Sequence, residues 1–108
     1  MDLEALGALL EEIPGFKNRV AYHKFPSGKF PGLPVIRYLV SDYITICADN
    51  RVYVNYPVLT IELCTENKDI AAENLVETAL DAAGLLYGKY EESTDSELCY
   101  VVAYTVCI

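Results

Sequence analysis

The chain has 108 residues, the length of one domain, and its hydrophobic content of 53% excludes a disordered protein. Its 16 acidic and 8 basic side chains give a net charge of −8, which argues against tight binding to nucleic-acid phosphates. Neither a signal peptide nor a run of ~20 apolar residues is recognisable, so we expect one soluble domain over residues 1–108, made in the cytosol, with no membrane partner.

The first segment predicts a helix over residues 3–13. Its apolar residues recur at helical spacing and form one stripe of Leu3, Leu6, Leu10 and Ile13. Asp2 is suited to cap the start of this helix, and Pro14-Gly15 ends it. Residues 19–25 follow and predict a strand.

Residues 26–34, PSGKFPGLP, predict an irregular loop, because three prolines and two glycines prevent regular structure there. Phe30 and Leu33 lie within this loop, and apolar loop residues need something to cover. Two interpretations stay open. The side chains plug the core of their own domain, or they pack on a neighbouring subunit.

The middle of the chain predicts strands over residues 35–40, 51–56 and 58–65, with 43–47 as a further short strand or a continuation. Asp49-Asn50 has the composition of a turn. Pro57 separates two of the strands and marks either a bend or an edge position, because proline cannot donate a ladder hydrogen bond. Alternation predicts one buried face, formed by Leu59, Ile61 and Leu63.

The last third predicts a helix over residues 70–83, favoured at its start by Asp69 and ended by Gly84. A strand over 85–90 and a polar turn follow. Residues 97–108 predict the longest strand, and both of its faces are apolar, as in a strand that is central in its sheet. Helices would cover one face. Cover for the second face is scarce in so short a chain, which favours self-association.

The predicted order is α-β-β-β-β-α-β-β, with all elements in one domain. Strands grouped between flanking helices indicate an α+β fold, in which two helices pack on a mainly antiparallel sheet.

Residues of the kinds used in catalysis are sparse in the sequence. His23 is the single histidine and falls on a predicted strand, away from any nucleophile motif. The four cysteines (Cys47, Cys64, Cys99 and Cys107) lack CxxC spacing, so we expect buried thiols, with a disulfide between neighbouring strands left open. No glycine-rich phosphate loop occurs. We therefore expect no enzyme, no cofactor and no metal site.

Three stretches of the second half resemble the small tail terminator (tail-completion) proteins of long-tailed phages and prophages of Gram-positive bacteria. They are ADNRVY (residues 48–53), TIELCTENKD (residues 60–69) and TDSELCYVVAYTVCI (residues 94–108). The second is similar to a strand-to-helix junction of the form YxIELYT…KD, although Cys64 stands where an aromatic residue is common. The third is similar to E-x-E-x-x-Y-x-x-x-Y in a terminal strand.

The resemblance implies a structural protein that forms a ring, typically of six copies, at the head-proximal end of the tail tube. Such a ring stops tube growth and presents a surface to the head. Its partners would be copies of itself, the major tail protein and head-completion proteins. It would assemble in the host cytoplasm and end in the virion. A stopper or head-completion subunit, and an unrelated small bacterial α+β binding domain, are the alternatives.

The same hypothesis assigns residues to two surfaces. Contacts between subunits would come from the loop and the predicted hairpin, with Phe25, Phe30, Leu33, Arg51, Tyr53 and Tyr56 as candidates. Acidic side chains would line a channel through which DNA passes without tight binding, with Glu91, Glu92, Asp95 and Glu97 as candidates. The alternative explanation of the acidity is solubility of the free subunit.

Overall fold

The structure is a computed structural model that describes residues 2–92 and 99–107, without the side chains of residues 47, 48 and 52–54. Two helices and five strands follow one another along the chain. They are α1 (Leu3–Glu11), β1 (Val20–Tyr22), β2 (Val35–Ala48), β3 (Arg51–Thr65), α2 (Ile70–Ala82), β4 (Tyr87–Glu92) and β5 (Tyr100–Cys107).

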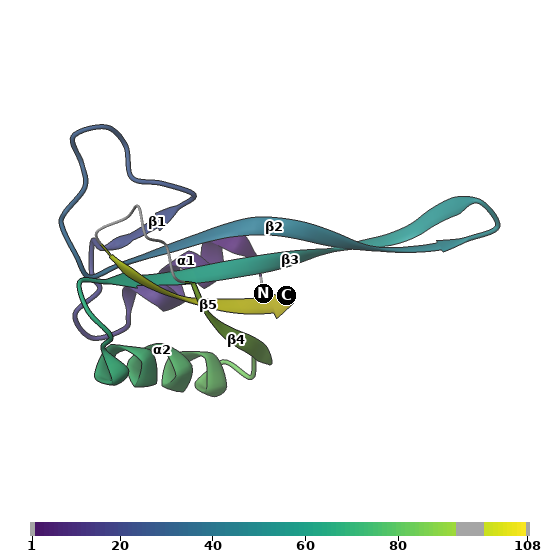
Figure 1. The fold of residues 1–108 in the computed structure, drawn as a ribbon. Helices are drawn as coiled ribbons and strands as arrows, with labels where there is room; N and C mark the ends of the chain where they lie inside the picture. The colour runs from purple at the N-terminus through teal and green to yellow at the C-terminus, as the bar shows by residue number, and fades with distance from the viewer. Residues whose placement is uncertain (1, 93–98, 108) are drawn as a thin grey trace.

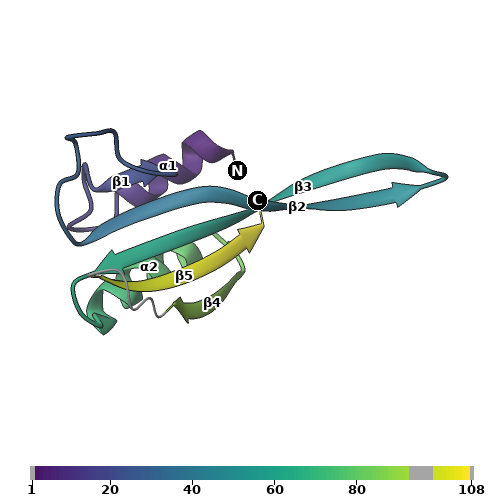
Figure 2. The ribbon, with the colours of Figure 1, turned by 45° about the horizontal axis from the view of Figure 1, so that its top comes forward.

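The strands form one sheet in the order β1-β2-β3-β5-β4, and β1–β2 is its parallel pair (Figures 1 and 2). The predicted α+β class, with two helices on a mainly antiparallel sheet, is confirmed. The inner position of β5, between β3 and β4, agrees with its two apolar faces. However, β3 is the longest strand at 15 residues, whereas β5 has eight.

Four strands were predicted between the two helices, whereas the structure has three, β1, β2 and β3. Residues 35–48 form one continuous strand, and residues 51–65 form another. Pro57 does not interrupt β3, because the pairing of β3 with β5 begins only at Val58. Pro57 pairs across the hairpin with Tyr43 and lies where β3 is an edge strand, which is where proline is tolerated.

The main core lies between the sheet and both helices, which cover the same face. Leu6 and Leu10 of α1 and Val76 and Leu80 of α2 are completely buried against it. The face of β3 predicted to be buried is confirmed, since Leu59, Ile61 and Leu63 all belong to this core. Each helix begins at a capping aspartate. The amide of Ala5 donates to Asp2 Oδ1 at 2.7 Å, and that of Ala72 donates to Asp69 Oδ1 at 3.1 Å.

The opposite face of the sheet receives part of its cover from the loop that follows β1. Phe25 and Leu33 of this loop pack against Val35, Cys64 and Val101. The loop is held by the Arg19 guanidinium, whose Nη1 donates to the carbonyl oxygens of Gly32 at 2.9 Å and Pro34 at 3.3 Å. The loop thus covers one end of the sheet face that points away from the helices. The predicted lack of cover applies only to the rest of that face.

Candidate functional site

The hairpin of β2 and β3 extends beyond the rest of the sheet as a two-stranded projection (Figures 1 and 2). We call residues 43–57 the arm. Its strands pair with each other from Tyr43↔Pro57 to Ala48↔Arg51, whereas the pairing of β2 with β1 ends at Tyr38. From Val58 to the tip, β3 rises by roughly 25 Å at the usual spacing of a strand. The longest dimension of the molecule is 49 Å.

The turn at the arm tip is built by Asp49 and Asn50, as the sequence predicts. Both residues have positive φ angles, of 53° and 60°. Two such residues form the loop that matches the natural twist of a hairpin, and Asp and Asn tolerate this conformation. The arm is therefore a tight hairpin, specified by its own turn, with Arg51 exposed next to that turn.

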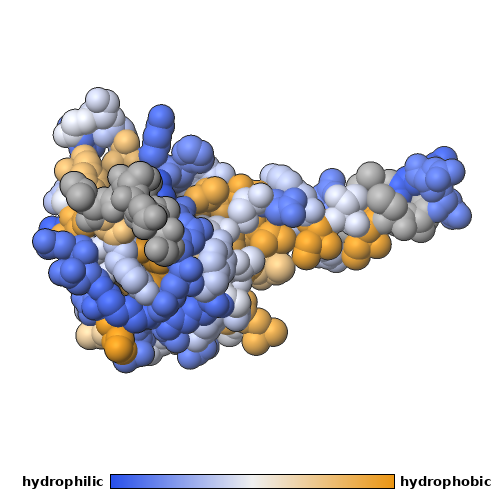
Figure 3. Space-filling view, in the orientation of Figure 1, coloured by the Kyte–Doolittle hydropathy of each residue, from blue (hydrophilic) through white to orange (hydrophobic). Residues whose placement is uncertain are grey.

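The arm carries large apolar side chains that nothing in the described part of the chain covers. Tyr43 is 58% exposed, Ile44 and Ile46 are each 49% exposed, and Tyr56 is 44% exposed. Ile44 is paired directly with Tyr56, and Ile46 lies two residues along, so these three share one face of the hairpin. Figure 3 shows apolar surface along the projecting arm.

The other face of the arm is more polar and is joined to the sheet at a bulge. Thr45 Oγ1 and Asn55 Oδ1, which lie opposite one another, form a 2.6 Å hydrogen bond. At the base, the register shifts at Ser41, whose hydroxyl donates to the Val58 carbonyl at 3.2 Å and accepts from Thr60 Oγ1 at 2.9 Å. These bonds fix the arm to the strand pair at the point where it leaves the body.

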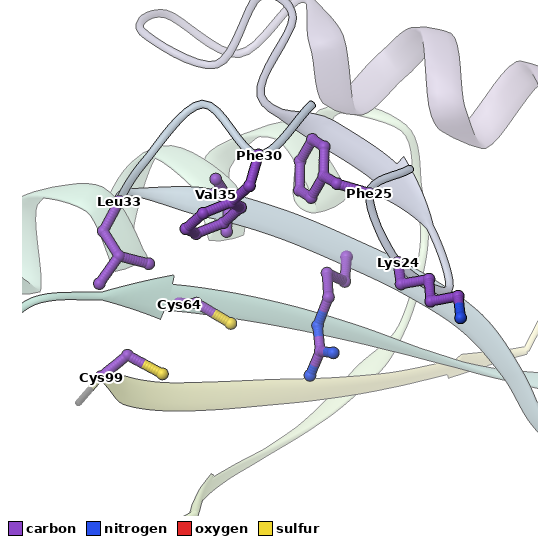
Figure 4. A pocket seen from close by; sticks show the side chains of 8 residues that line it. Lys24, Phe25, Phe30, Leu33, Val35, Cys64 and Cys99 are labelled. Carbon is purple, nitrogen blue, oxygen red and sulfur yellow. The ribbon is translucent and has the colours of Figure 1, made fainter. Parts of the chain in front are cut away.

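A shallow apolar groove of about 310 Å³ lies at the opposite end of the molecule, between the loop and the sheet (Figure 4). Its lining comes from the loop, β2, β3 and the approach to β5, through Lys24, Phe25, Phe30, Leu33, Val35, Arg37, Cys64 and Cys99. The rings of Phe25 and Phe30 meet edge to face, with centroids 5.7 Å apart. Phe30 is 58% exposed, so its ring forms an open wall of the groove.

The groove also contains two cations and two thiols. Arg37 Nη2 donates to both carboxylate oxygens of Glu62, at 3.2 and 3.1 Å, while Lys24 is exposed at the rim. Burial raises the pKa of the Cys64 thiol to about 11, although the neighbouring Arg37 opposes the shift. A thiol with such a pKa is unreactive at neutral pH. The groove is therefore suited to bind an apolar group, and its Cys64 thiol is not a poised nucleophile.

The predicted interface residues fall into two places. Phe25, Phe30 and Leu33 surround the groove, whereas Arg51 and Tyr56 lie on the arm. Tyr53 belongs to the arm by position, but its side chain lies outside the described residues. Sequence reasoning missed Tyr43, Ile44 and Ile46. The apolar side chains of residues 43–47 were visible in the sequence. Their exposure follows only from the structure, in which this segment continues β2 beyond the rest of the sheet.

Glu91 and Glu92, the two predicted channel residues that the structure describes, lie on opposite sides of the sheet. Glu91 pairs opposite the core residue Val102, on the helix side, whereas Glu92 pairs opposite Val101, on the other side of the sheet. Glu91 also forms an ion pair with Lys68. Hydrogen bonds from Lys68 and Tyr100 lower the pKa of this carboxylate. Asp95 and Glu97 lie outside the described residues.

A polar network joins α2 to the sheet and holds the helix in place. Glu73 is buried, and its carboxylate lies 2.9 Å from Lys68 Nζ and 2.8 Å from Lys89 Nζ. Burial alone would raise the pKa of Glu73, but hydrogen bonds from Lys89 and Lys68 outweigh it and lower the pKa. Glu77 accepts from Lys89 at 3.0 Å and from the buried hydroxyl of Tyr104 at 3.0 Å. Each of these side chains is paired with another in the folded chain, so the network serves to hold α2 on the sheet.

The remaining candidates for chemistry are separated from one another. His23 lies just past the end of β1, so the prediction that it falls on a strand is wrong; its side chain is exposed and its φ is 68°. The prediction of buried thiols holds for Cys64 but is wrong for Cys107, which is exposed at the end of β5. Across residues 2–92 and 99–107, no three His, Cys, Asp or Glu side chains are grouped as metal ligands. Neither helix in that part of the chain is long and apolar enough to cross a membrane.

No family model matches this sequence, and a search of curated proteins finds no match. The arm and the groove are therefore the features of the described residues that bear on function.

Proposed function

We propose that this chain is a structural assembly subunit, a tail terminator that forms a ring at the head-proximal end of a phage tail tube. The observation that carries the proposal is the arm, which projects from a well-packed body with four large apolar side chains exposed. A two-stranded hairpin with free edges and apolar side chains in water invites contact with another chain. A subunit of a permanent assembly buries such a surface in its partners.

The chemistry of the described residues is consistent with this role. The buried ionisable groups that the structure describes are engaged in packing the helices and strands, as in the pair of Glu73 with its two lysines. The groove offers apolar rings and aliphatic groups to a partner side chain. Of the acidic residues predicted to line a channel, Glu92 is the described one that lies on the side of the sheet away from the helices.

The proposal is tested by deleting the coding gene from the phage or prophage that carries it and supplying the protein in trans. Without a terminator, tail tubes grow past their normal length and do not join heads, and both defects are visible in electron micrographs. The unchanged chain should restore tails of uniform length. Ile44→Asp should not, because it places a charge on the apolar face of the arm.

The control is Thr45→Asp, on the other face of the same hairpin, which should restore normal tails. If deletion leaves tail length normal but stops heads from joining tails, the chain is a head-completion subunit and the terminator role is wrong. If deletion leaves intact, infectious particles, the chain is no virion assembly protein.

A further inference from the structure

The arm and the groove are two different apolar surfaces at opposite ends of the same sheet. Strand β3 connects them, since Arg51 lies at the arm tip and Cys64 lines the groove. These residues are 13 positions apart, or about 43 Å at the usual rise of a strand. A continuous strand of that length cannot fold back on itself, so the arm cannot fill the groove of its own chain.

We propose that the arm of one copy docks its apolar face, Ile44, Ile46 and Tyr56, in the apolar groove of a second copy. This inference rests on the proposed assembly function and names the surfaces that would make the contact. Each copy offers one arm and one groove. The contact joins two unlike surfaces, and a heterologous contact of this kind closes into a ring when the rotation between neighbours allows it.

The area available fits a weak contact between copies. The three residues of the docking face, Ile44, Ile46 and Tyr56, present roughly 300 Å² of exposed surface, taking 150–250 Å² for each large side chain. With an equal area on the groove, one contact would bury about 600 Å² in total, below the ~1,200–2,000 Å² of a stable interface between proteins. We therefore expect assembly that depends strongly on protein concentration.

One pair of opposite charges accompanies the two apolar surfaces. Lys24 is exposed at the rim of the groove, whereas Arg37 is already paired with Glu62. The exposed carboxylate of Asp42 flanks the apolar face of the arm at its base, while at the tip Asp49 lies two residues from the exposed Arg51. Opposite charges around an apolar contact favour one partner orientation and speed the encounter. Phe30 is the groove residue that would lose most water, because its exposed ring stands at the opening.

The contact is tested by disulfide trapping between two singly labelled chains. The arm-labelled chain carries Ile44→Cys together with Cys47→Ser, Cys64→Ala, Cys99→Ala and Cys107→Ser. The groove-labelled chain retains Cys99 and carries Cys47→Ser, Cys64→Ala and Cys107→Ser. The two are mixed in equal amounts and oxidised with copper phenanthroline, and sedimentation velocity follows the assembly of the same mixture before oxidation.

Docking predicts that the mixed disulfide exceeds both same-label disulfides by about tenfold, because the two thiols share a high effective concentration in the complex. Moving the arm cysteine from Ile44 to Thr45, on the opposite face, should abolish this excess. In the unlabelled chain, Phe30→Asp and Ile44→Asp should each raise the dissociation constant for self-association about 10- to 100-fold. Leu86→Asp, at an exposed apolar residue between α2 and β4, should change it less than about twofold.

A dominant arm–arm or groove–groove disulfide would overturn the proposed docking and assign like surfaces to the contact. Assembly by sedimentation without any excess of the mixed disulfide would overturn the docking but leave the proposed assembly function standing. If the unlabelled chain stays monomeric at every concentration and purified tail tubes do not recruit it, both proposals are wrong.

Discussion

The two halves of strand β3 have the same secondary structure and opposite surroundings. In the body, Leu59, Ile61 and Leu63 have exposed fractions of 0%, 0% and 1%, because two helices cover their face. In the arm, Tyr56 on the same strand is 44% exposed. The body half owes its stability to burial. The arm half continues the strand by hydrogen bonds and cross-strand pairs alone, which keep an isolated hairpin only marginally stable in water.

The buried residues of the body therefore stabilise the fold, whereas the exposed residues of the arm are available for contact with other chains. Removing an apolar group from the body should cost stability, and removing one from the arm should cost assembly.

The largest effect on stability is expected from Ile61→Ala. Its side chain is completely buried in the main core, and truncation of a buried isoleucine leaves a cavity that costs about 2–5 kcal/mol. The matched control is Ile44→Ala in the arm, where the side chain is half exposed and the expected change is within about 0.5 kcal/mol. Urea denaturation of the dilute monomer measures both. Equal losses from the two substitutions would contradict the distinction between body and arm.

An intermediate effect is expected from Glu73→Gln, because the buried carboxylate accepts from two lysines and an amide replaces it poorly. A hydrogen bond to a charged group contributes about 1–3 kcal/mol, so a loss of this order is expected. The folded protein lowers the pKa of Glu73 below 4.5. The stability from this group is therefore complete above pH 4.5 and is lost as pH falls through the folded-state pKa.

The variant should accordingly lose less free energy of unfolding than the unchanged chain when the pH is lowered below 4.5. Urea titrations at neutral pH and at several acidic values measure the difference. Parallel acid dependence in the two proteins would show that Glu73 is not the group that links folding to protonation.

Only a small effect on stability is expected from shortening the arm. Residues 43–57 can be replaced by Asn-Gly, because Asp42 and Val58 are already paired and a two-residue turn of this kind closes a hairpin. The body loses no core contact, so the free energy of unfolding should change by less than about 1 kcal/mol. Circular dichroism and urea denaturation measure this. Loss of folding would mean that the arm contributes to the core.

Most of the fold was predictable because local signals agreed with burial. The helix stripes, the capping aspartates and the alternation in β3 each fix an element within a few residues, and the core face followed from them. Pro57 misled the count of strands, since a proline suggests a break when its neighbours are unknown. Only the tertiary pairing, with β5 ending at the level of Val58, shows that this residue lies at an edge.

The candidate site was predictable only in part. Phe30 and Tyr56 were recognisable as apolar residues near loops or turns. The exposure of Ile44 and Ile46 was not, because alternating apolar residues look the same in a buried strand and in a projecting one. The two carboxylates of Glu91 and Glu92 were grouped by sequence proximity, whereas strand geometry places them on opposite sides of the sheet.

The most direct test of the central claim is sedimentation velocity of the unchanged chain and the arm-shortened chain over a wide range of concentration. Our account predicts that the unchanged chain passes from monomer to a larger, closed assembly as concentration rises. The shortened chain, folded to the same stability, should remain monomeric throughout. Assembly of both chains at the same concentrations would show that the arm is not the assembly surface and would contradict the account.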